Sequence, residues 1–180
     1  MTDASLSLEL SAYSPMWPVV FDIERGRLEA IFGDDTVLIE HVGSTAVPGM
    51  GAKPIIDILL GAPSLAVIER HIPGLVESGY RYVPEFEQAI PERRYFTKRD
   101  GHPGHFHLHA VVYDTAFWMD QIAFRDLLRT DPGYAERYWR LKSALATRFR
   151  RDREGYTDAK SEFIRGALER ARSLRRDSAA

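Results

Sequence analysis

The sequence predicts an α+β fold, with a mixed β-sheet, flanking helices and a helical C-terminal third. Residues 54–60 form a nearly continuous apolar run of strand length, which is typical of a central strand covered on both faces. Helix-type and strand-type apolar spacings alternate up to residue 113, whereas only helix-type spacing follows residue 114. A chain of 180 residues is also long enough to bury a sizeable core.

The first helix is expected to begin near Ser14-Pro15 and to end before Gly33. Its predicted apolar stripe consists of Val20, Ile23, Leu28 and Ile31. Strands are expected over 36–42 and 54–60, joined by a loop of small residues over 43–52. A helix over 64–78 should be kinked or split by Pro73, because proline interrupts the helical hydrogen-bond ladder.

Three further strands are expected, and a turn should join the last two at 100–104. Their predicted ranges are 80–85, 93–99 and 105–113. Asp114 is the expected N-cap of the helical part, and Asp158 the expected N-cap of the last helix. Apolar stripes in between predict two more helices.

The composition excludes several classes of protein. With 44% hydrophobic and 28% charged residues the chain is neither disordered nor fibrous. The absence of cysteine excludes a disulfide scaffold, a cysteine-ligated metal and a thiol nucleophile. No apolar run approaches the ~20 residues of a membrane span, and Met1-Thr2-Asp3 does not open a signal peptide. We expect a soluble, cytoplasmic protein with no membrane partner.

The charge is distributed unevenly along the chain. Residues 121–180 hold 15 Lys and Arg but 9 Asp and Glu, although the whole chain carries a net charge of -2. Such a basic segment attracts phosphates or packs against an acidic body. The arginine cluster of 148–153 is flanked by the acidic residues Asp152 and Glu154, so it neither indicates nor excludes a nucleic-acid partner.

The first candidate site is a glycine–serine turn followed by a lone acidic residue. His41-Val-Gly-Ser44 ends a predicted strand, and Asp57 interrupts the next, apolar one. Glycine allows backbone amides to approach an anion closely. A carboxylate in an apolar strand is costly unless it is paired or binds a cation. Together they predict a phosphate cradle beside a metal-binding carboxylate, while an ordinary loop and a capping Asp57 remain the structural alternative.

The second candidate is a strand that carries three histidines on one face. His105, His107 and His109 alternate with apolar residues, so their imidazoles project to the same side and could bind a divalent metal or transfer protons. In the preceding strand, Arg94 and Lys98 share one side and Arg93 the other. The sequence does not decide which side faces the histidines.

In combination these motifs resemble the GrpB family, which is placed in the DNA polymerase β-like nucleotidyltransferase superfamily. The resemblance rests on the segments 39–49, 52–58, 93–98, 107–109, 123–127 and 155–164. It implies that residues 1–180 form a single nucleotidyltransferase-like domain, with an α/β core over 1–113 and a helical portion over 114–180. Related domains also occur fused behind dephospho-CoA kinase.

The resemblance also implies roles for individual residues. Asp57, His107 and His109 would be the catalytic metal-binding residues. The phosphate-binding residues would be Gly43, Ser44, Lys53, Arg94, Lys98 and Lys160. Superfamily members carry a second acid two residues after the first, where this chain has Leu59. The expected cofactor is Mg²⁺ or Mn²⁺, with Zn²⁺ or Ni²⁺ possible because imidazole suits them.

Three functions follow from this constellation. The first is metal-dependent transfer of a nucleotidyl group from a nucleoside triphosphate to an unidentified acceptor. The second is a non-catalytic module that binds a nucleotide or a coenzyme A-related ligand, which the missing acid at Leu59 favours. The third is a phosphoesterase in which histidine-bound metal activates water.

Overall fold

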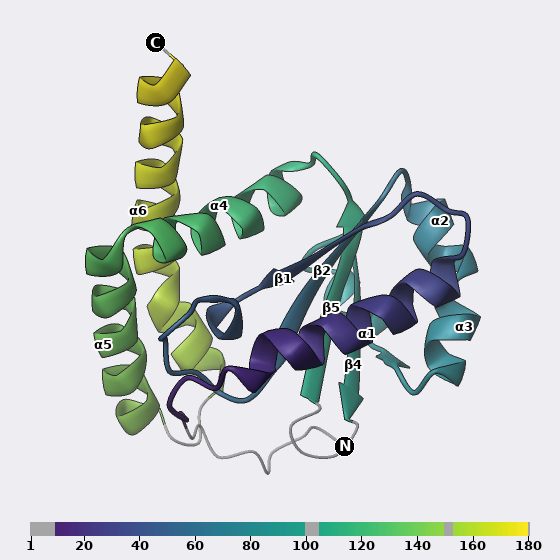
Figure 1. Ribbon diagram of the computed structural model, residues 1–180, viewed down its shortest axis with the longest axis horizontal. Coiled ribbons are helices and arrows are strands. Elements are labelled where there is room, and N and C mark those ends of the chain that lie inside the picture. Colours follow the sequence, from purple (N-terminus) through teal and green to yellow (C-terminus); the bar gives the residue numbers. More distant parts are fainter. Residues whose placement is uncertain (1–9, 100–104, 150–152, 180) are drawn as a thin grey trace.

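The computed structural model describes residues 10–99, 105–149 and 153–179, and Figure 1 shows a sheet with helices packed around it. The sheet has the strand order β1-β2-β5-β4-β3. Its strands are β1 (Leu38–Val42), β2 (Ile56–Ala62), β3 (Arg81–Tyr82), β4 (Arg93–Arg99) and β5 (His105–Val112). Only β2 and β5 pair in parallel, and the other three pairs are antiparallel. The predicted α+β class with a mixed sheet is therefore confirmed.

One face of the sheet, here called the core face, is covered by three helices. They are α1 (Met16–Phe32), α2 (Leu65–Arg70) and α3 (Ile72–Glu77). Side chains alternate between the two faces along each strand, so every second residue of β2 and β5 points toward this core. Ile58 and Leu108 are two of these residues and are fully buried. The predicted helix over 64–78 is split at His71, and Pro73 lies in the first turn of α3, where its missing N–H costs nothing.

The opposite face, here called the pocket face, carries the alternate residues of the same strands. Leu59 and Val111 pack there with Trp118 of α4 (Ala116–Thr130). Two more helices, α5 (Pro132–Arg148) and α6 (Arg153–Ala179), complete the helical portion. Figure 1 shows α5 and α6 to one side of the sheet, with the yellow end of α6 projecting beyond the other helices. No helix in the described ranges combines the length and apolar character of a membrane span.

The inward face of α1 differs from the predicted stripe. Its buried residues are Trp17, Phe21, Glu24, Leu28 and Phe32. Ile23, predicted to point inward, is 56% exposed. The aliphatic residues alone gave a rotated stripe, because the three aromatic side chains bury more area and thus decide which face packs.

Three predicted element boundaries also need correction. The strand expected over 80–85 is shorter than predicted and consists of β3 alone. It ends early because Pro84 begins a short 3-10 helix and cannot donate a hydrogen bond to the sheet. Asp114 has a positive φ of 60°, so Thr115 is the N-cap of α4. Asp158 lies inside α6, which begins at Arg153. The turn predicted at 100–104 falls outside the described residues.

Candidate functional site

The loop after β1 places a glycine directly against a carboxylate. Gly43 has φ 72° and ψ -171°, a region that is essentially restricted to glycine. A Cβ atom at this position would overlap the Asp57 carboxylate. Glycine is therefore required for two reasons, and Ser44 follows it at the start of a short 3-10 helix, Ser44–Ala46. The Gly43-Ser44 turn lies beside Asp57, as the sequence predicts.

A buried histidine fixes this turn. Thr45 Oγ1 donates its proton to the Ile55 carbonyl at 3.1 Å, so it accepts from His41 Nε2 at 3.0 Å. The His41 ring stacks on Phe21, with ring centroids 4.7 Å apart. The pKa of His41 is lowered to about 4, chiefly by burial. The charge of Asp57 opposes this shift, and the nearby Arg129 and Arg125 contribute to it. His41 is therefore a neutral donor that ties β1 to the start of β2.

The parallel pairing of β2 and β5 brings Asp57 and His107 together. They are register partners, and His107 Nδ1 lies 3.3 Å from Asp57 Oδ1. Burial raises the pKa of Asp57, but the hydrogen bond from His107 and the nearby His107, His109 and Lys160 outweigh it and hold the pKa below its ordinary value. Asp57 is therefore ionised, and it orients the imidazole of His107.

His109 is held by an arginine on the neighbouring strand. Arg93 Nη1 lies 3.3 Å from His109 Nδ1. A guanidinium only donates, so Nδ1 accepts and the proton of the neutral imidazole sits on Nε2. Burial lowers the pKa of His109 to about 3, with Arg93 and His107 contributing, although Asp57 opposes the shift. His109 thus offers an N–H donor through Nε2 and has no lone pair left for a metal.

A pocket of about 350 Å³ joins these elements to the helical portion. Six of the predicted site residues line it: Ser44, Lys53, Asp57, His107, His109 and Lys160. Gly43 packs against one of them, Asp57, from the turn. Tyr138 and Lys142 of α5 add to the lining, as Lys160 of α6 does. Burial lowers the pKa of Lys160 despite the opposing charge of Asp57.

The sequence reasoning missed Lys142. Its side chain is 3% exposed, and its Nζ donates to the Gly51 carbonyl at 2.9 Å. Burial lowers the pKa of Lys142 to about 7, and the charge of Lys160 adds to the effect while Asp57 opposes it. A signal was present in the sequence: Lys142 falls four residues after Tyr138 and three before Leu145, on the inward face of α5.

The helical portion holds the end of β1 and the loop that follows it, residues 41–51, through three basic side chains. Arg125 Nη1 donates to the His41 carbonyl at 3.2 Å, and Arg129 Nε donates to the Ala46 carbonyl at 2.9 Å. Lys142 holds Gly51 in the same way. Part of the basic excess of residues 121–180 is therefore used to position the loop that carries Ser44.

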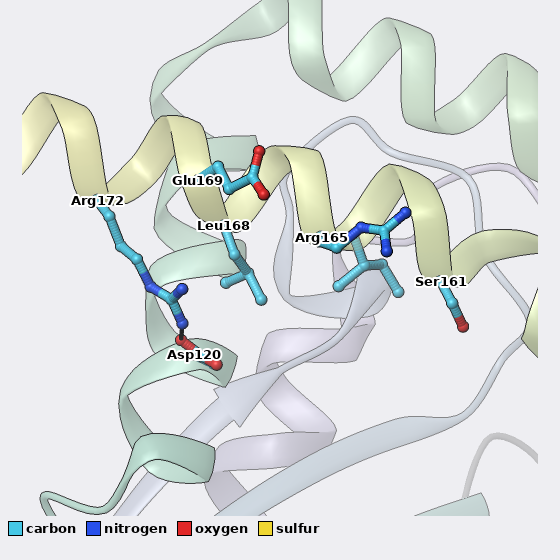
Figure 2. A pocket seen from close by; sticks show the side chains of 7 residues that line it. Asp120, Ser161, Arg165, Leu168, Glu169 and Arg172 are labelled. Atoms are coloured by element: carbon cyan, nitrogen blue, oxygen red, sulfur yellow. Dashed lines mark hydrogen bonds and ion pairs between the residues drawn. The ribbon is translucent and has the colours of Figure 1, made fainter.

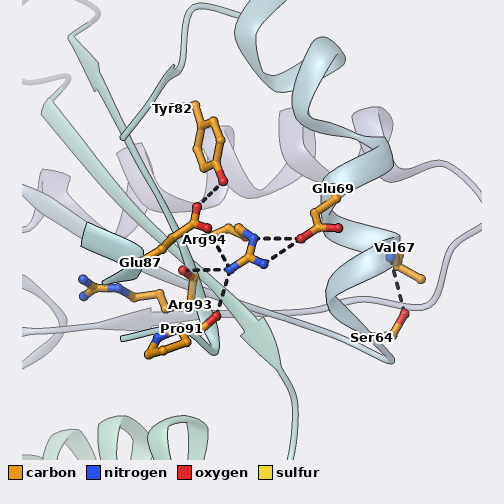
Figure 3. Close-up of polar contacts among 8 residues, drawn as sticks. All are labelled: Ser64, Val67, Glu69, Tyr82, Glu87, Pro91, Arg93 and Arg94. Atoms are coloured by element: carbon orange, nitrogen blue, oxygen red, sulfur yellow. Dashed lines mark hydrogen bonds and ion pairs between the residues drawn. The ribbon is translucent and has the colours of Figure 1, made fainter. Parts of the chain in front are cut away.

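Two predicted phosphate ligands do not reach the pocket. Arg94 and Lys98 pair in register with Ala110 and Phe106, so they point to the core face. Figure 3 shows Arg94 bonded to Glu69 and to the Pro91 carbonyl. Lys98 Nζ lies 2.9 Å from Glu24 Oε1, and both side chains are buried. The prediction that they neutralise a bound phosphate is corrected, because strand alternation puts both on the core face. Arg93 lies on the pocket face instead, where it contacts His109.

Comparison with known proteins decides the family. Residues 7–170 match the family model described as GrpB protein. The chain belongs to the GrpB family. A UPF0157 protein of Halalkalibacterium halodurans is 36% identical over 167 residues, covering 92% of this chain and 83% of that protein. The glutamate-rich protein GrpB of Alkalihalophilus pseudofirmus is 36% identical, covering 86% and 90%. The UPF0157 protein YqkA of Bacillus subtilis is longer, and this chain spans only 47% of it at 34% identity.

Solved structures support the same assignment. The crystal structure of the conserved protein GrpB from Enterococcus faecalis has a TM-score of 0.79 at 30% identity, over 91% of this chain and 96% of that one. A cytoplasmic RNA terminal U-transferase gives a TM-score of 0.42 at 11% identity, over 70% and 43%. A likeness this weak carries nothing about activity. The dephospho-CoA kinase of Mycolicibacterium paratuberculosis is 29% identical over 87% of this chain and 44% of its own length.

The donor set of this GrpB-family chain does not fit a resident metal held by Asp57, His107 and His109. Among the described residues, no three His, Asp or Glu side chains converge as a metal-binding group. Asp57 and His107 contact each other, and His109 Nε2 carries a proton. Leu59, where a second acid is expected, is fully buried among apolar side chains. One carboxylate suits a cation that arrives with phosphates, because Mg²⁺ keeps its waters and needs few protein ligands.

A second hollow of similar volume, about 360 Å³, lies between α4 and α6 of the GrpB-family chain. Figure 2 shows Arg172 of α6 reaching Asp120 of α4, with a contact of 2.7 Å. None of the predicted site residues lines this hollow. The pocket at Asp57 is therefore the candidate site.

Proposed function

We propose that the pocket binds a nucleoside triphosphate together with its divalent cation, and that the chain transfers the nucleotidyl group to an acceptor. The observation that carries the proposal is the meeting of the Gly43-Ser44 turn, Asp57 and several lysines in one pocket. Cations and N–H donors fixed around a phosphate stabilise the charge that develops when its bond to the leaving group breaks.

Each residue has a role in this proposal that follows from its position. The Ser44 hydroxyl and the adjoining backbone hold a phosphate, and Lys53 and Lys160 neutralise its charge. His109 donates from Nε2 to a phosphate oxygen. Asp57 provides the carboxylate for a cation carried by the triphosphate, and its charge keeps His107 oriented. The acceptor attacks the α-phosphorus and pyrophosphate leaves.

The ligand set favours Mg²⁺ or Mn²⁺ as the accompanying ion. A carboxylate and phosphate oxygens are hard ligands, which these ions prefer. Zn²⁺ or Ni²⁺ would need imidazole lone pairs, and His109 gives up that role as long as Arg93 donates to its Nδ1.

A second candidate is a binding module that holds a nucleotide or a coenzyme A-related ligand without turning it over. The buried Leu59 favours it, because the pocket face then presents a single carboxylate from β2. The match to a dephospho-CoA kinase is the reason to include coenzyme A precursors among the ligands tested.

Incubation of the protein with each α-labelled and γ-labelled nucleoside triphosphate and a panel of divalent ions tests the proposal. Pyrophosphate release with label on an acceptor supports transfer. Saturable binding without product supports the binding module, and release of inorganic phosphate or a nucleoside monophosphate supports a phosphoesterase.

Asp57→Asn is the decisive variant in that assay. We expect at least a tenfold loss of cation-dependent nucleotide binding, since one lost charge–charge contact of about 1.4 kcal/mol corresponds to tenfold. Asp22→Asn removes a carboxylate of α1 that is 58% exposed and serves as the matched control. Equal binding by both variants would contradict the assignment of Asp57.

A further inference from the structure

Two lysines from different helices of the C-terminal portion meet at the pocket. Lys142 belongs to α5 and Lys160 to α6, and both line the same space as Ser44 and Asp57. The partners of Lys142 are neutral: its Nζ donates to the Gly51 carbonyl and lies 5.0 Å from the Tyr138 ring centroid and 5.5 Å from that of Trp139. A carbonyl and two rings stabilise an ammonium without cancelling its charge.

Among the described residues, Lys142 contacts no carboxylate. Asp57 lines the same pocket, but its carboxylate contacts His107 instead. A buried ammonium whose partners are neutral is costly and gains strongly when an anion arrives. Lys142, which is 3% exposed, is therefore a lining residue whose charge a bound anion would match.

The surroundings of Lys142 make its charge conditional on that ligand. In the part of the chain that the structure describes, the ionisable groups that line the pocket with it are Lys160, Asp57, Tyr138, Lys53, His107 and His109. Burial and Lys160 lower the pKa of Lys142 to about 7, so the amine is only partly protonated at neutral pH. A dianion beside it would outweigh both effects, because an opposite charge at short range favours the protonated amine.

We propose that Lys142 and Lys160 form a subsite for a phosphate dianion, and that Lys142 becomes fully protonated when the dianion arrives. The inference deepens the proposed function, on which it rests for the location of the ligand. It adds that the ligand needs a terminal, doubly charged phosphate group, and that a phosphodiester with a single charge binds poorly. The proton is taken up from solvent.

The proposal has a measurable consequence. Above neutral pH the free pocket loses the charge of Lys142, so each binding event takes up a proton. The dissociation constant then rises with pH, approaching about tenfold per pH unit. Below about pH 6 Lys142 is already protonated in the free protein, and no uptake accompanies binding.

Sulfate is the probe that isolates this effect, because it remains a dianion throughout pH 6–9. Its binding to the full chain is measured by calorimetry in buffers of different ionisation enthalpy. At pH 8 we expect an uptake of close to one proton, and at pH 6 almost none. Methyl sulfate, a monoanion of similar shape, should bind at least tenfold more weakly at pH 7.

Two variants of Lys142 test the assignment. Lys142→Arg keeps a permanent charge, so sulfate affinity should become independent of pH between 7 and 9. Lys142→Met should weaken sulfate binding at least tenfold at pH 6.5. The control Arg140→Met removes a charge from the same helix, at a side chain that is 76% exposed, and should behave like the wild type.

The outcomes separate this inference from the proposed function. Unchanged sulfate affinity in Lys142→Met, or no proton uptake at pH 8, overturns the subsite and leaves Lys142 as a structural donor to Gly51. Sulfate binding with the expected proton uptake, in a protein that binds no nucleoside triphosphate, supports the subsite and overturns the nucleotide proposal. A thermal unfolding curve for each variant confirms that the binding data come from folded protein.

Discussion

The two faces of the sheet differ in how their charged side chains are paired. On the core face, Lys98 is buried against Glu24, and Arg94 bonds to Glu69 and Glu87, so that cations meet carboxylates. On the pocket face Arg125 also meets a carboxylate, that of Glu40. Two cations next to the candidate site differ, because Arg93 donates to a neutral imidazole and Lys142 to a carbonyl. A cation that is paired with a carboxylate stabilises the fold and has no remaining capacity to bind an anionic ligand. A cation whose partners are neutral retains that capacity.

The contrast is sharpest within single strands. Arg93 and Arg94 are adjacent in β4, yet one borders the candidate site and the other anchors α2 through Glu69. The residue type alone therefore does not predict the role of these two arginines. Their roles depend on the side chain that each one meets on the neighbouring element. Each of the following experiments tests this difference, which would be contradicted if variants on the two faces changed stability and ligand affinity in the same way.

The largest effect is expected for Glu24→Ala on the core face. Glu24 is 1% exposed and pairs with the buried Lys98 and with Arg27. Removing it leaves Lys98 buried without its carboxylate, which should cost about 3–5 kcal/mol of unfolding free energy. Urea denaturation measures the loss, and sulfate affinity should stay unchanged below the transition.

Glu29→Ala is the matched control on the same helix. Its carboxylate is 58% exposed and 3.7 Å from Arg25, so the change should cost less than about 0.5 kcal/mol. A loss for Glu24→Ala no larger than that of the control would show that the buried pair contributes nothing to stability.

Acid should destabilise the protein through one histidine associated with each face. The pKa of His41 is about 4 and that of His109 about 3, both below the ordinary value. Between pH 6.5 and 4 the unfolded chain therefore binds protons that the folded one does not, and stability falls as pH falls. His41 alone, 6% exposed, should account for up to about 3 kcal/mol.

Urea midpoints at several pH values between 4.5 and 7 measure this slope. His41→Gln keeps a donor for Thr45 but does not titrate, so its slope should be clearly shallower. Wild-type stability that does not change over this range would contradict the neutral, buried state of His41.

The smallest effect on binding is expected for Arg94→Met. Arg94 donates to Glu69 through two nitrogens, so its loss should cost about 1–2 kcal/mol of stability. Sulfate affinity should stay within about twofold of the wild type, because the side chain lies on the core face. Lys160→Met on the pocket side should instead weaken sulfate binding about tenfold. Equal losses in both variants would contradict the division between the faces.

The convergence of Asp57 and His107 could be predicted from the sequence, because an acid in a central strand and alternating histidines in a later one leave few other arrangements. The placement of Arg94 and Lys98 could not. The alternation of side chains along a strand shows which residues share a face of the sheet. Which face becomes the core depends on the helices that cover the sheet. The predictions that Asp114 and Asp158 are N-caps were wrong, because aspartate also suits other positions. Asp114 adopts a left-handed turn conformation, and Asp158 lies within α6.

Lys142 shows a different limit. It lies on the inward face of α5, but its chemistry depends on Gly51, Lys160 and Asp57, which come from three other parts of the chain. No local pattern carries information about a contact between residues so far apart in sequence.

By itself the sequence determined the mixed sheet, the glycine–serine turn beside an aspartate, and the family, because all three depend on local spacing and on residue types that few other conformations accommodate. Only the tertiary structure decided which charges are paired and which remain available to a ligand. That outcome depends on the partner each side chain meets across the fold, and burial makes the presence or absence of an opposite charge matter far more than it does in water.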